Sequence, residues 1–306
     1  MKNKLLIVGT MAYDSIETPF GKVDMVLGGA GTYIGLAASN FSIDCSLVSI
    51  VGSDFNDQHI KLLKNKGIDL SGLELSNHQK TFFWSGKYEN DLNKRTTIDT
   101  QLNALENFNP IVPNHLRNPD ILMLGNLSPG IQIHVIEQLK KKPSLIVLDT
   151  MNYWIENFRS DLEKVVSMVD VISINDEEAY QFTGESSLLR ASVCIQKLGP
   201  KYVIIKKGEH GALLFHSNKI FSAPALPLEK VVDPTGAGDS FAGGFSGFLT
   251  QTGDISLEKV KSAVIYGSVL ASFAVQKFGT QNLFNISSTS LLNRVNAFKE
   301  LTTFEL

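Results

Sequence analysis

Short, nearly uninterrupted apolar runs alternate along this chain with longer segments of helical period. The runs read KLLIVG at residues 4–9, CSLVSIVG at 45–52, DILMLGN at 120–126, SLIVLDT at 144–150, VDVISIN at 169–175 and KYVIIKKG at 201–208. Continuous apolar runs of this length are typical of parallel strands that are buried on both faces. Together they predict a large sheet.

Between the runs lie segments that predict helices, at residues 28–41, 54–67 and 129–143. In the second of these we expect Asp54 to be the N-terminal cap and Gly67 to end the helix. This alternation predicts an α/β fold with a doubly wound, mostly parallel sheet flanked by helices, which binds ligands at the carboxyl ends of its strands. Residues 211–224 predict an antiparallel hairpin, and two helices follow Ser256.

Two polar, strand-like segments interrupt this order, and we expect them to form a small β-sheet lid from about residues 12–27 and 79–99. Residues 1–306 would then form one domain with a lid over the strand ends, although two surface hairpins would give the same pattern. In the second segment Phe82, Trp84 and Tyr88 share one face of a strand. That face either stacks on a substrate ring or packs internally.

The composition excludes several classes of protein. The chain has 306 residues, 43% of them hydrophobic and 19% charged, with a net charge of −3, which is typical of a globular domain and gives no reason to expect nucleic acid as a partner. Its first ten residues contain only a short apolar run, which predicts neither a signal peptide nor a membrane partner. We therefore expect a cytoplasmic protein. The two cysteines, Cys45 and Cys194, predict no disulfide framework or zinc site.

The stretch DPTGAGDS, at residues 233–240, carries the clearest candidate chemistry. Small residues at 236–238 precede a segment of helical period and predict the first turn of a helix, whose free amides and dipole attract a phosphate. Asp239 beside them could accept a proton from an attacking hydroxyl, as phosphoryl transfer requires. An aspartate at a helix start is, however, also a common cap.

The continuation DPTGAGDSFAGGF resembles the C-terminal signature of the ribokinase-like (PfkB) carbohydrate kinase family. The resemblance extends over most of the chain, through VGTMAYD with Asp14, the diglycine segment GGAGTYIGLAASN, NDEEAY with Asn175 and Glu178, and KKGEHGALLF. It implies that Asp239 is the catalytic base and that Gly236, Ala237 and Gly238 offer amides to the transferring phosphate. Substrate binding is implied for Asp14, Gly28, Gly29 and Asp239.

The resemblance also implies sites for ATP and ions. Asn175 and Glu178 would organise the Mg²⁺ and phosphate region, with Glu178 acting on Mg²⁺ largely through water. Asn-x-x-Glu is equally the pattern of a helix capping box, and both interpretations can hold. Lys207 and Gly208 would border the nucleotide, together with Gly236 and Gly238. Asp233, Thr235 and Gly279 resemble a monovalent-cation loop, which would hold K⁺.

One position departs from the family pattern. Where many members have an asparagine that holds the substrate, this chain has Tyr33, which could stack on a ring and donate a hydrogen bond, or fill volume. Asn126 and Asn152 follow predicted strands and are further candidates to bind substrate hydroxyls, although they could equally be turn residues. The chain has no P-loop motif, and its glycine-rich segment does not match the dinucleotide fingerprint.

These expectations combine into an ATP-dependent kinase that phosphorylates a hydroxyl, in particular a primary CH₂OH, of a small sugar, as ribokinases and fructokinases do. A nucleoside kinase of the adenosine type is the alternative. A non-catalytic sugar or nucleotide sensor with the same fold is a third possibility. Exposed strand edges on the lid further predict a homodimer through the lid.

Overall fold

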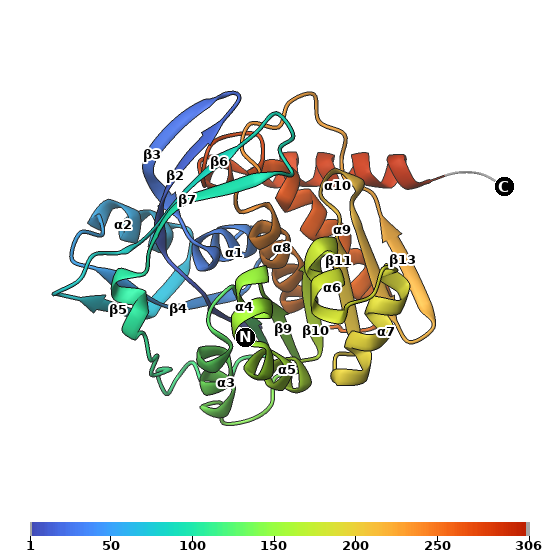
Figure 1. The fold of residues 1–306 in the computed structure, drawn as a ribbon, viewed down its shortest axis with the longest axis horizontal. Coiled ribbons are helices and arrows are strands. Elements are labelled where there is room, and N and C mark those ends of the chain that lie inside the picture. Colours follow the sequence, from blue (N-terminus) through green and yellow to red (C-terminus); the bar gives the residue numbers. More distant parts are fainter. Residues whose placement is uncertain (1, 304–306) are drawn as a thin grey trace.

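A nine-stranded sheet is the backbone of the fold in the computed structural model, which describes residues 2–303 (Figure 1). The strand order is β13-β12-β11-β10-β9-β8-β1-β4-β5, and only β12 and β13 run antiparallel to their neighbours. The strands are β1 (Lys4–Val8), β4 (Asp44–Gly52), β5 (Ile68–Ser76), β8 (Ile121–Leu124), β9 (Leu145–Asp149), β10 (Val171–Asn175), β11 (Tyr202–Lys206), β12 (Ala212–His216) and β13 (Lys219–Ala223). The doubly wound, mostly parallel sheet expected from the sequence is confirmed.

All six apolar runs are strands of this sheet, and residues 211–224 form the expected hairpin. The edge strand β5 was not expected. Its sequence, IDLSGLELS, lacks an apolar run because an edge strand keeps more of its side chains in solvent.

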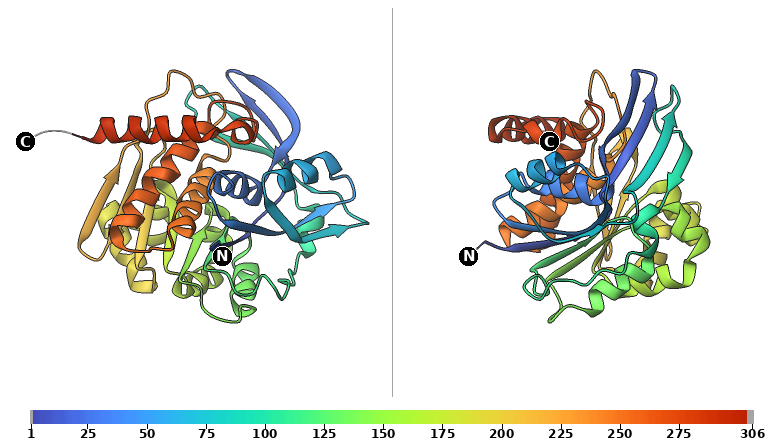
Figure 2. Two further views of the ribbon diagram at one scale, coloured as in Figure 1. Left: turned by 180° about the vertical axis from the view of Figure 1, so that it is seen from behind. Right: turned by 90° about the vertical axis from the view of Figure 1, so that its left-hand side faces the viewer.

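Helices cover both faces of the sheet, and Figure 2 shows the two helical layers with the sheet between them. One layer contains α1 (Ala30–Ala38), α2 (Asp57–Asn65), α8 (Ala237–Thr252), α9 (Leu257–Ala274) and α10 (Ser288–Thr302). The other contains α3 (Pro129–Glu137), α4 (Asn152–Asn157), α5 (Arg159–Met168), α6 (Asp176–Thr183) and α7 (Leu188–Leu198). Short 3₁₀ turns lie at Asn103–Asn107, Gly208–His210 and Leu283–Asn285.

The strands alternate their side chains between two hydrophobic cores. In β1, Leu5 and Ile7 belong to the core under α8 and α9, whereas Leu6 and Val8 belong to the core under α5 and α7. Burial on both faces explains why the strands read as continuous apolar runs.

The start of α2 differs from the expectation. Asn56, and not Asp54, caps the helix, by accepting a hydrogen bond from the amide of Gln58 at 2.8 Å. The Asp54 carboxylate is instead bound by the amide and hydroxyl of Thr81, both at 2.7 Å. A tertiary contact has therefore taken the residue that the local pattern assigned to the cap.

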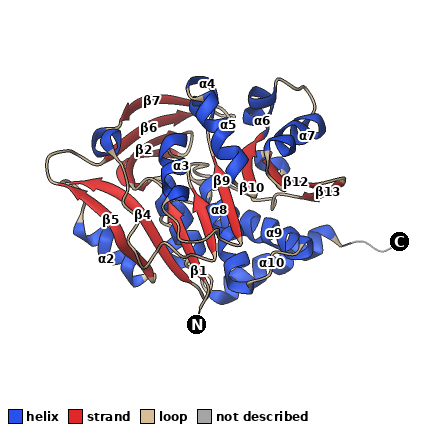
Figure 3. Cartoon of the chain, turned by 90° about the horizontal axis from the view of Figure 1, so that it is seen from below, coloured by secondary structure: helices blue, strands red, loops and turns tan. Residues whose placement is uncertain are grey.

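A second sheet of four strands stands over one edge of the first, as Figure 3 shows from below. Its order is β3-β2-β6-β7, with β2 (Ala12–Thr18), β3 (Gly21–Gly28), β6 (Phe82–Tyr88) and β7 (Arg95–Gln101). These strands come from the two segments from which we expected a small β-sheet. Only residues 9–11 join β1 to β2, so the second sheet rises directly from the carboxyl end of a central strand.

None of the helices described between residues 2 and 303 combines the length and apolar character that a membrane crossing needs.

Candidate active site

The GAGD segment lies at the N-terminus of α8. Gly236 is the cap residue, with φ of 73°, a left-handed conformation that favours glycine, and the helix begins at Ala237. The amide of Ala237 donates to the Pro234 carbonyl at 3.2 Å, whereas the Ser240 amide donates to Gly236 within the helix at 2.8 Å. The amides of Gly238 and Asp239 lie in the first turn, at the positive end of the helix dipole, a position that favours anions.

The Asp239 carboxyl lies in a strongly charged environment. Burial, reinforced by the nearby Asp149 carboxylate, raises its pKa to about 7. The cations Lys206 and Arg95 act in the opposite direction. A carboxyl with a pKa close to neutrality is well suited to accept a proton from a hydroxyl group.

Asp14 and the diglycine face Asp239 from the second sheet. The side chain of Asp14, only 4% exposed, lies so close to Gly28 that a β-carbon there would overlap its carboxylate. Gly29, at φ 90°, caps α1, and its backbone amide lowers the pKa of the nearby Asp14 carboxyl. Burial and the Asp233 carboxylate raise the pKa of Asp14 to about 7. The structure therefore brings Asp14, Gly28 and Gly29 together.

Tyr33 is buried in the first turns of α1, with 1% of its surface exposed. A β-carbon on Gly236 would overlap its ring, so the helix starts of α1 and α8 touch through these two residues. Its hydroxyl is buried and has no hydrogen-bond partner among the described residues. The charges of Asp14, Asp233 and Asp239 raise its pKa further than burial alone.

Asn175 and Glu178 form a capping box at the start of α6. The Asn175 side chain accepts from the Glu178 amide at 2.7 Å, and the Glu178 carboxylate accepts from the Asn175 amide at 2.9 Å. This confirms the capping interpretation of Asn-x-x-Glu. Burial raises the pKa of Glu178 to about 7, against the attraction of Lys206.

Two residues that the sequence reasoning missed, Lys206 and Asp149, lie at the centre of the site. The Lys206 Nζ and the Asp149 Oδ1 are 2.9 Å apart, and both side chains are largely buried. The alternation of side chains along a strand could have identified them. Tyr202 and Ile204 precede Lys206 on the face covered by α8, and Leu145 and Val147 precede Asp149 on the same face. The alternation of side chains therefore directs both residues toward Asp239.

Lys207 and Gly208 lie just beyond β11. The amide of Lys207 donates to the Gly211 carbonyl at 2.7 Å and begins the 3₁₀ turn. Gly208, at φ 53°, lies against the turn of the second sheet, since a β-carbon there would be 2.8 Å from Asn93 Oδ1. The turn between β6 and β7 thus reaches the loop expected to border the nucleotide.

Asp233 joins the residues of the expected cation loop. Its fully buried carboxylate accepts from the amides of Thr235 and Gly279, each at 2.8 Å. Thr235 in turn donates from its hydroxyl to the Tyr88 hydroxyl on β6 at 3.1 Å. The loop before α8, the chain at Gly279 and the second sheet are therefore tied together at one point.

The face of the second sheet that carries Asp14 also carries Trp84, because these residues are direct neighbours in the parallel β2–β6 pair. The Trp84 ring lies over Gly86, and the Arg95 guanidinium of β7 lies 5.3 Å from its centre. Arg95 is a further site residue that the sequence reasoning missed, and its charge lowers the pKa of Asp239 and Glu178. Phe83, on the opposite face, packs against the core.

Asn126 and Asn152 have different surroundings. Asn126 donates to the Met151 sulfur at 3.1 Å and accepts from the Trp154 indole at 2.7 Å, so its amide is held within the fold. Asn152 is exposed at the first position of α4.

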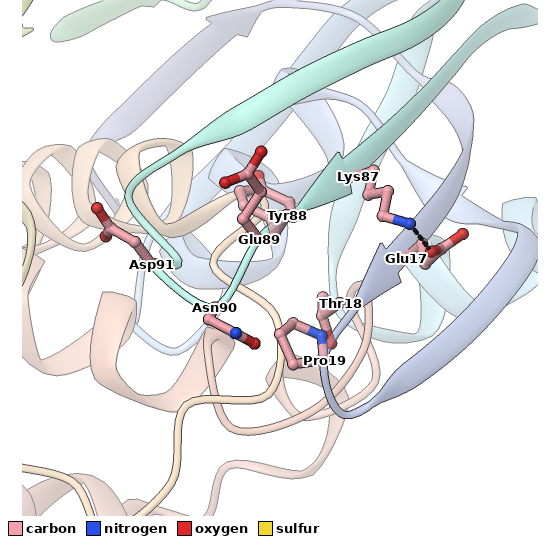
Figure 4. Close-up of a pocket in the computed structure, with 8 residues that line it drawn as sticks. All are labelled: Glu17, Thr18, Pro19, Lys87, Tyr88, Glu89, Asn90 and Asp91. Atoms are coloured by element: carbon pink, nitrogen blue, oxygen red, sulfur yellow. Dashed lines mark ion pairs between the residues drawn. The ribbon is translucent and has the colours of Figure 1, made fainter.

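An open groove of about 620 Å³ lies at the ends of β2 and β6 and not over Asp239 (Figure 4). It is lined by Glu17, Thr18, Pro19 and residues 87–91, and the ion pair between Lys87 and Glu17 crosses its rim. Tyr88 separates this groove from the loop before α8. The candidate site itself lies under the second sheet, where the buried carboxyls of Asp14 and Asp239 are found.

Within residues 2–303 no cluster of three or more histidine, cysteine, aspartate or glutamate side chains could hold a metal ion. Mg²⁺ keeps several waters and is commonly bound through phosphates and one or two carboxylates. The buried Glu178 carboxyl, which is close to Lys206 and so to the first turn of α8, fits this mode of binding.

Comparisons of sequence point to one family. The model of the pfkB family carbohydrate kinases matches residues 2–286. A cytidine kinase of Thermococcus kodakarensis is 28% identical over 79% of this chain and 86% of that protein. A nucleoside kinase of Methanothermobacter thermautotrophicus is 27% identical over 93% of each chain. Further relatives are named inositol 3-kinase and ribokinase.

The fold agrees with these comparisons. The complex of a proposed ribokinase II of E. coli with ATP and Mg²⁺ superposes with a TM-score of 0.77, at 20% identity, covering 98% of this chain and 99% of that one. The comparisons support a kinase and not a non-catalytic sensor.

Proposed function

This chain belongs to the pfkB family of carbohydrate kinases, and on that premise we propose that it transfers the terminal phosphoryl group of ATP to the primary hydroxyl of a nucleoside. The observation that carries the choice of a nucleoside is the position of Trp84 beside Asp14 on one face of the second sheet. An indole next to the carboxylate that binds sugar hydroxyls offers a surface for a planar base. The cytidine and nucleoside kinases among the relatives support this choice.

The chemistry follows from the charges around α8. Asp14 accepts hydrogen bonds from the sugar hydroxyls, and Asp239 takes the proton of the attacking hydroxyl. The amides at the start of α8 bind the oxygens of the transferring group, where negative charge must be stabilised. Mg²⁺, when bound, neutralises charge on the phosphates, and Glu178 is the residue we assign to hold it, through water. Asn175 orients Glu178 through the capping box.

A free sugar is the second candidate, and Arg95 favours it. Gly86 covers one face of the Trp84 ring and the Arg95 guanidinium lies 5.3 Å from the ring centre, so a base can stack there only if the exposed Arg95 moves aside. The sequence alone favoured the sugar. The names of the relatives and the position of Trp84 together favour the nucleoside.

The test is turnover with ATP and Mg²⁺ against a panel of nucleosides and of free pentoses and hexoses, followed by ADP release. We expect kcat/KM for the best nucleoside to exceed that for the best free sugar by at least about tenfold, the effect of one lost favourable contact. A free sugar that is the better substrate would replace the nucleoside by the second candidate.

We also propose that K⁺ binds near Asp233, Thr235 and Gly279 and that the chain forms a cytoplasmic homodimer through the second sheet. The edge strands β3 and β7 support a dimer, because unpaired edges are commonly covered by another chain. The Asp233 carboxylate already accepts hydrogen bonds from the amides of Thr235 and Gly279, so these three residues are held together without a cation. A bound K⁺ would stabilise this loop further.

A further inference from the structure

Lys206 is a buried cation at the carboxyl end of β11. The strand pairs in parallel with β10, so Lys206 lies beside Asn175, and the side chain points to the face covered by α8. Only 16% of the side chain is exposed, and 7% of its partner Asp149. A buried ammonium is costly unless it is paired, and Asp149 at 2.9 Å provides that pairing.

The ammonium has hydrogen-bonding capacity that the protein does not use. An ammonium has three N–H donors, and within the described residues only the Asp149 carboxylate accepts from Lys206. The Nζ atom lies 3.1 Å from where a β-carbon on Gly238 would be, so the remaining donors lie beside the first turn of α8. The absence of a side chain at Gly238 keeps this space open for an anion.

The site also needs a cation at this point. Asp149, Glu178 and Asp239 surround Lys206 on three separate elements, and each raises its pKa. A triphosphate would add further negative charge next to these carboxylates. A fixed cation at the anion-binding helix start stabilises such charge most effectively where water is excluded.

We propose that Lys206 is a catalytic residue, whose ammonium, held by Asp149, donates a hydrogen bond to a non-bridging oxygen of the phosphoryl group in transit; this rests on the kinase function proposed above. In the transfer, the acceptor oxygen forms a bond to the γ-phosphorus. The bond from that phosphorus to the β–γ bridging oxygen breaks, and its electron pair stays on ADP. The hydroxyl proton goes to Asp239, and Lys206 keeps its own protons throughout.

The test compares Lys206→Met with Lys201→Met. Lys201 lies just before the same strand and also pairs with a buried aspartate, Asp170, at 3.7 Å, but at the amino end of the strand, away from the candidate site. Calorimetry with ATP and with ADP, each with Mg²⁺ and without acceptor, reports on the γ-phosphate alone. We expect Lys206→Met to weaken ATP binding at least about tenfold and leave ADP binding unchanged, as the loss of a charged hydrogen bond predicts.

Turnover gives the second readout. We expect kcat of Lys206→Met to fall about a hundredfold or more, as for the loss of one donor to the transition state, while Lys201→Met stays within twofold of the wild type. Equal weakening of ATP and ADP, or unchanged ATP affinity with kcat within about threefold, would show a purely structural role and overturn the proposal.

Removal of the lysine leaves Asp149 buried without its partner and could unfold the chain. The double variant Lys206→Met with Asp149→Asn removes both charges. If it also loses affinity for ATP but not for ADP, the proposal holds, and if it binds the two equally weakly, the proposal is overturned. If the wild type prefers ATP yet phosphorylates no nucleoside or sugar, the proposed acceptor is wrong, and the affinity ratio still decides on Lys206. If the wild type does not bind ATP, both proposals fail.

Discussion

The ring of Tyr33 lies directly against the backbone of Gly236, so the starts of α1 and α8 are in contact where the diglycine segment meets the GAGD segment. A β-carbon at Gly236 would overlap the ring, and its φ of 73° is also unfavourable for any other residue. Two physical reasons therefore require glycine here. They can be separated by experiment, because Gly184 has nearly the same φ, 71°, with no atom within 4 Å of an added β-carbon.

We expect Gly236→Ala to lower the free energy of unfolding by more than Gly184→Ala. The left-handed conformation alone costs about 1–2 kcal/mol in either variant. Overlap with Tyr33 adds about 1–3 kcal/mol and displaces the helix start. Urea unfolding measures the difference, and turnover should fall only in Gly236→Ala. Equal destabilisation of the two variants would show that the Tyr33 contact yields without cost.

Asp239→Asn should keep the fold and ATP binding but lose turnover. The amide has nearly the shape of the carboxyl and cannot take the proton, so kcat should fall about a hundredfold to ten-thousandfold. Steady-state kinetics at saturating acceptor, with circular dichroism as the control for folding, checks this. A variant that retains more than about a third of the wild-type kcat would make Asp239 a helix cap and not a base.

Activity should rise with pH through about 7. Burial raises the pKa of both Asp14 and Asp239 to about 7, and in the mechanism that we propose both must be ionised, one to bind and the other to deprotonate the acceptor. The two carboxyls interact, so the acidic limb of kcat/KM belongs to the group and not to one residue. We expect a limb near pH 7 and a plateau above it. A profile that stays flat down to pH 5 would contradict the raised pKa values.

The stability of the ligand-free protein should change in the opposite direction. In the folded state the pKa of Asp14, Glu178 and Asp239 is about 7, above the ordinary values of 3.8 for aspartate and 4.5 for glutamate. Proton binding therefore favours folding, in full below pH 4 and progressively less up to about pH 7. We expect the Tm to fall as the pH rises from 5 to 8, and to fall less in Asp239→Asn.

Trp84→Ala separates a ligand surface from internal packing. If the indole contacts the base, KM for the nucleoside should rise about tenfold, the loss of one aromatic contact, and KM for a free sugar should not change. The Tm should change little, because one side of the ring faces Arg95 and not the core. A Tm lower by many degrees at constant KM would make Trp84 a packing residue.

The second sheet should pair with that of another copy. Its edge strands β3 and β7 leave backbone groups free, and residues 95–101 of β7 are exposed along their whole length. Light scattering at micromolar concentration should give about twice the monomer mass of 33.6 kDa. A mass near 33.6 kDa would exclude a stable dimer.

The interior strands β1, β4, β8, β9, β10 and β11 could be predicted because most of their side chains are buried on both faces, which makes each a nearly continuous apolar run. The edge strand β5 lacks that signal, since its outer side chains face solvent. The prediction of the α2 cap was wrong for a different reason. Asp54 and Asn56 are both good caps, and only the long-range contact of Asp54 with Thr81 decides between them.

The site divides in the same way. The glycine-rich turns and the capping box are local, so their residues could be named from the sequence. Lys206, Asp149 and Arg95 come from three strands and meet only in the folded chain. Strand alternation indicates which face Lys206 and Asp149 occupy, but the proximity of that face to Asp239 depends on how α8 packs on the sheet.

Asp14 belongs to the second sheet, whereas Asp239 belongs to a helix packed on the first. An acceptor molecule bound by both residues, as we propose, would therefore link two sheets that share no strand pairing. Part of its binding free energy must hold them together, and by thermodynamic linkage anything that holds them together must tighten the acceptor. Occupancy of the site should thus slow amide hydrogen exchange in β6 and β7, strands that contribute neither of the two carboxylates.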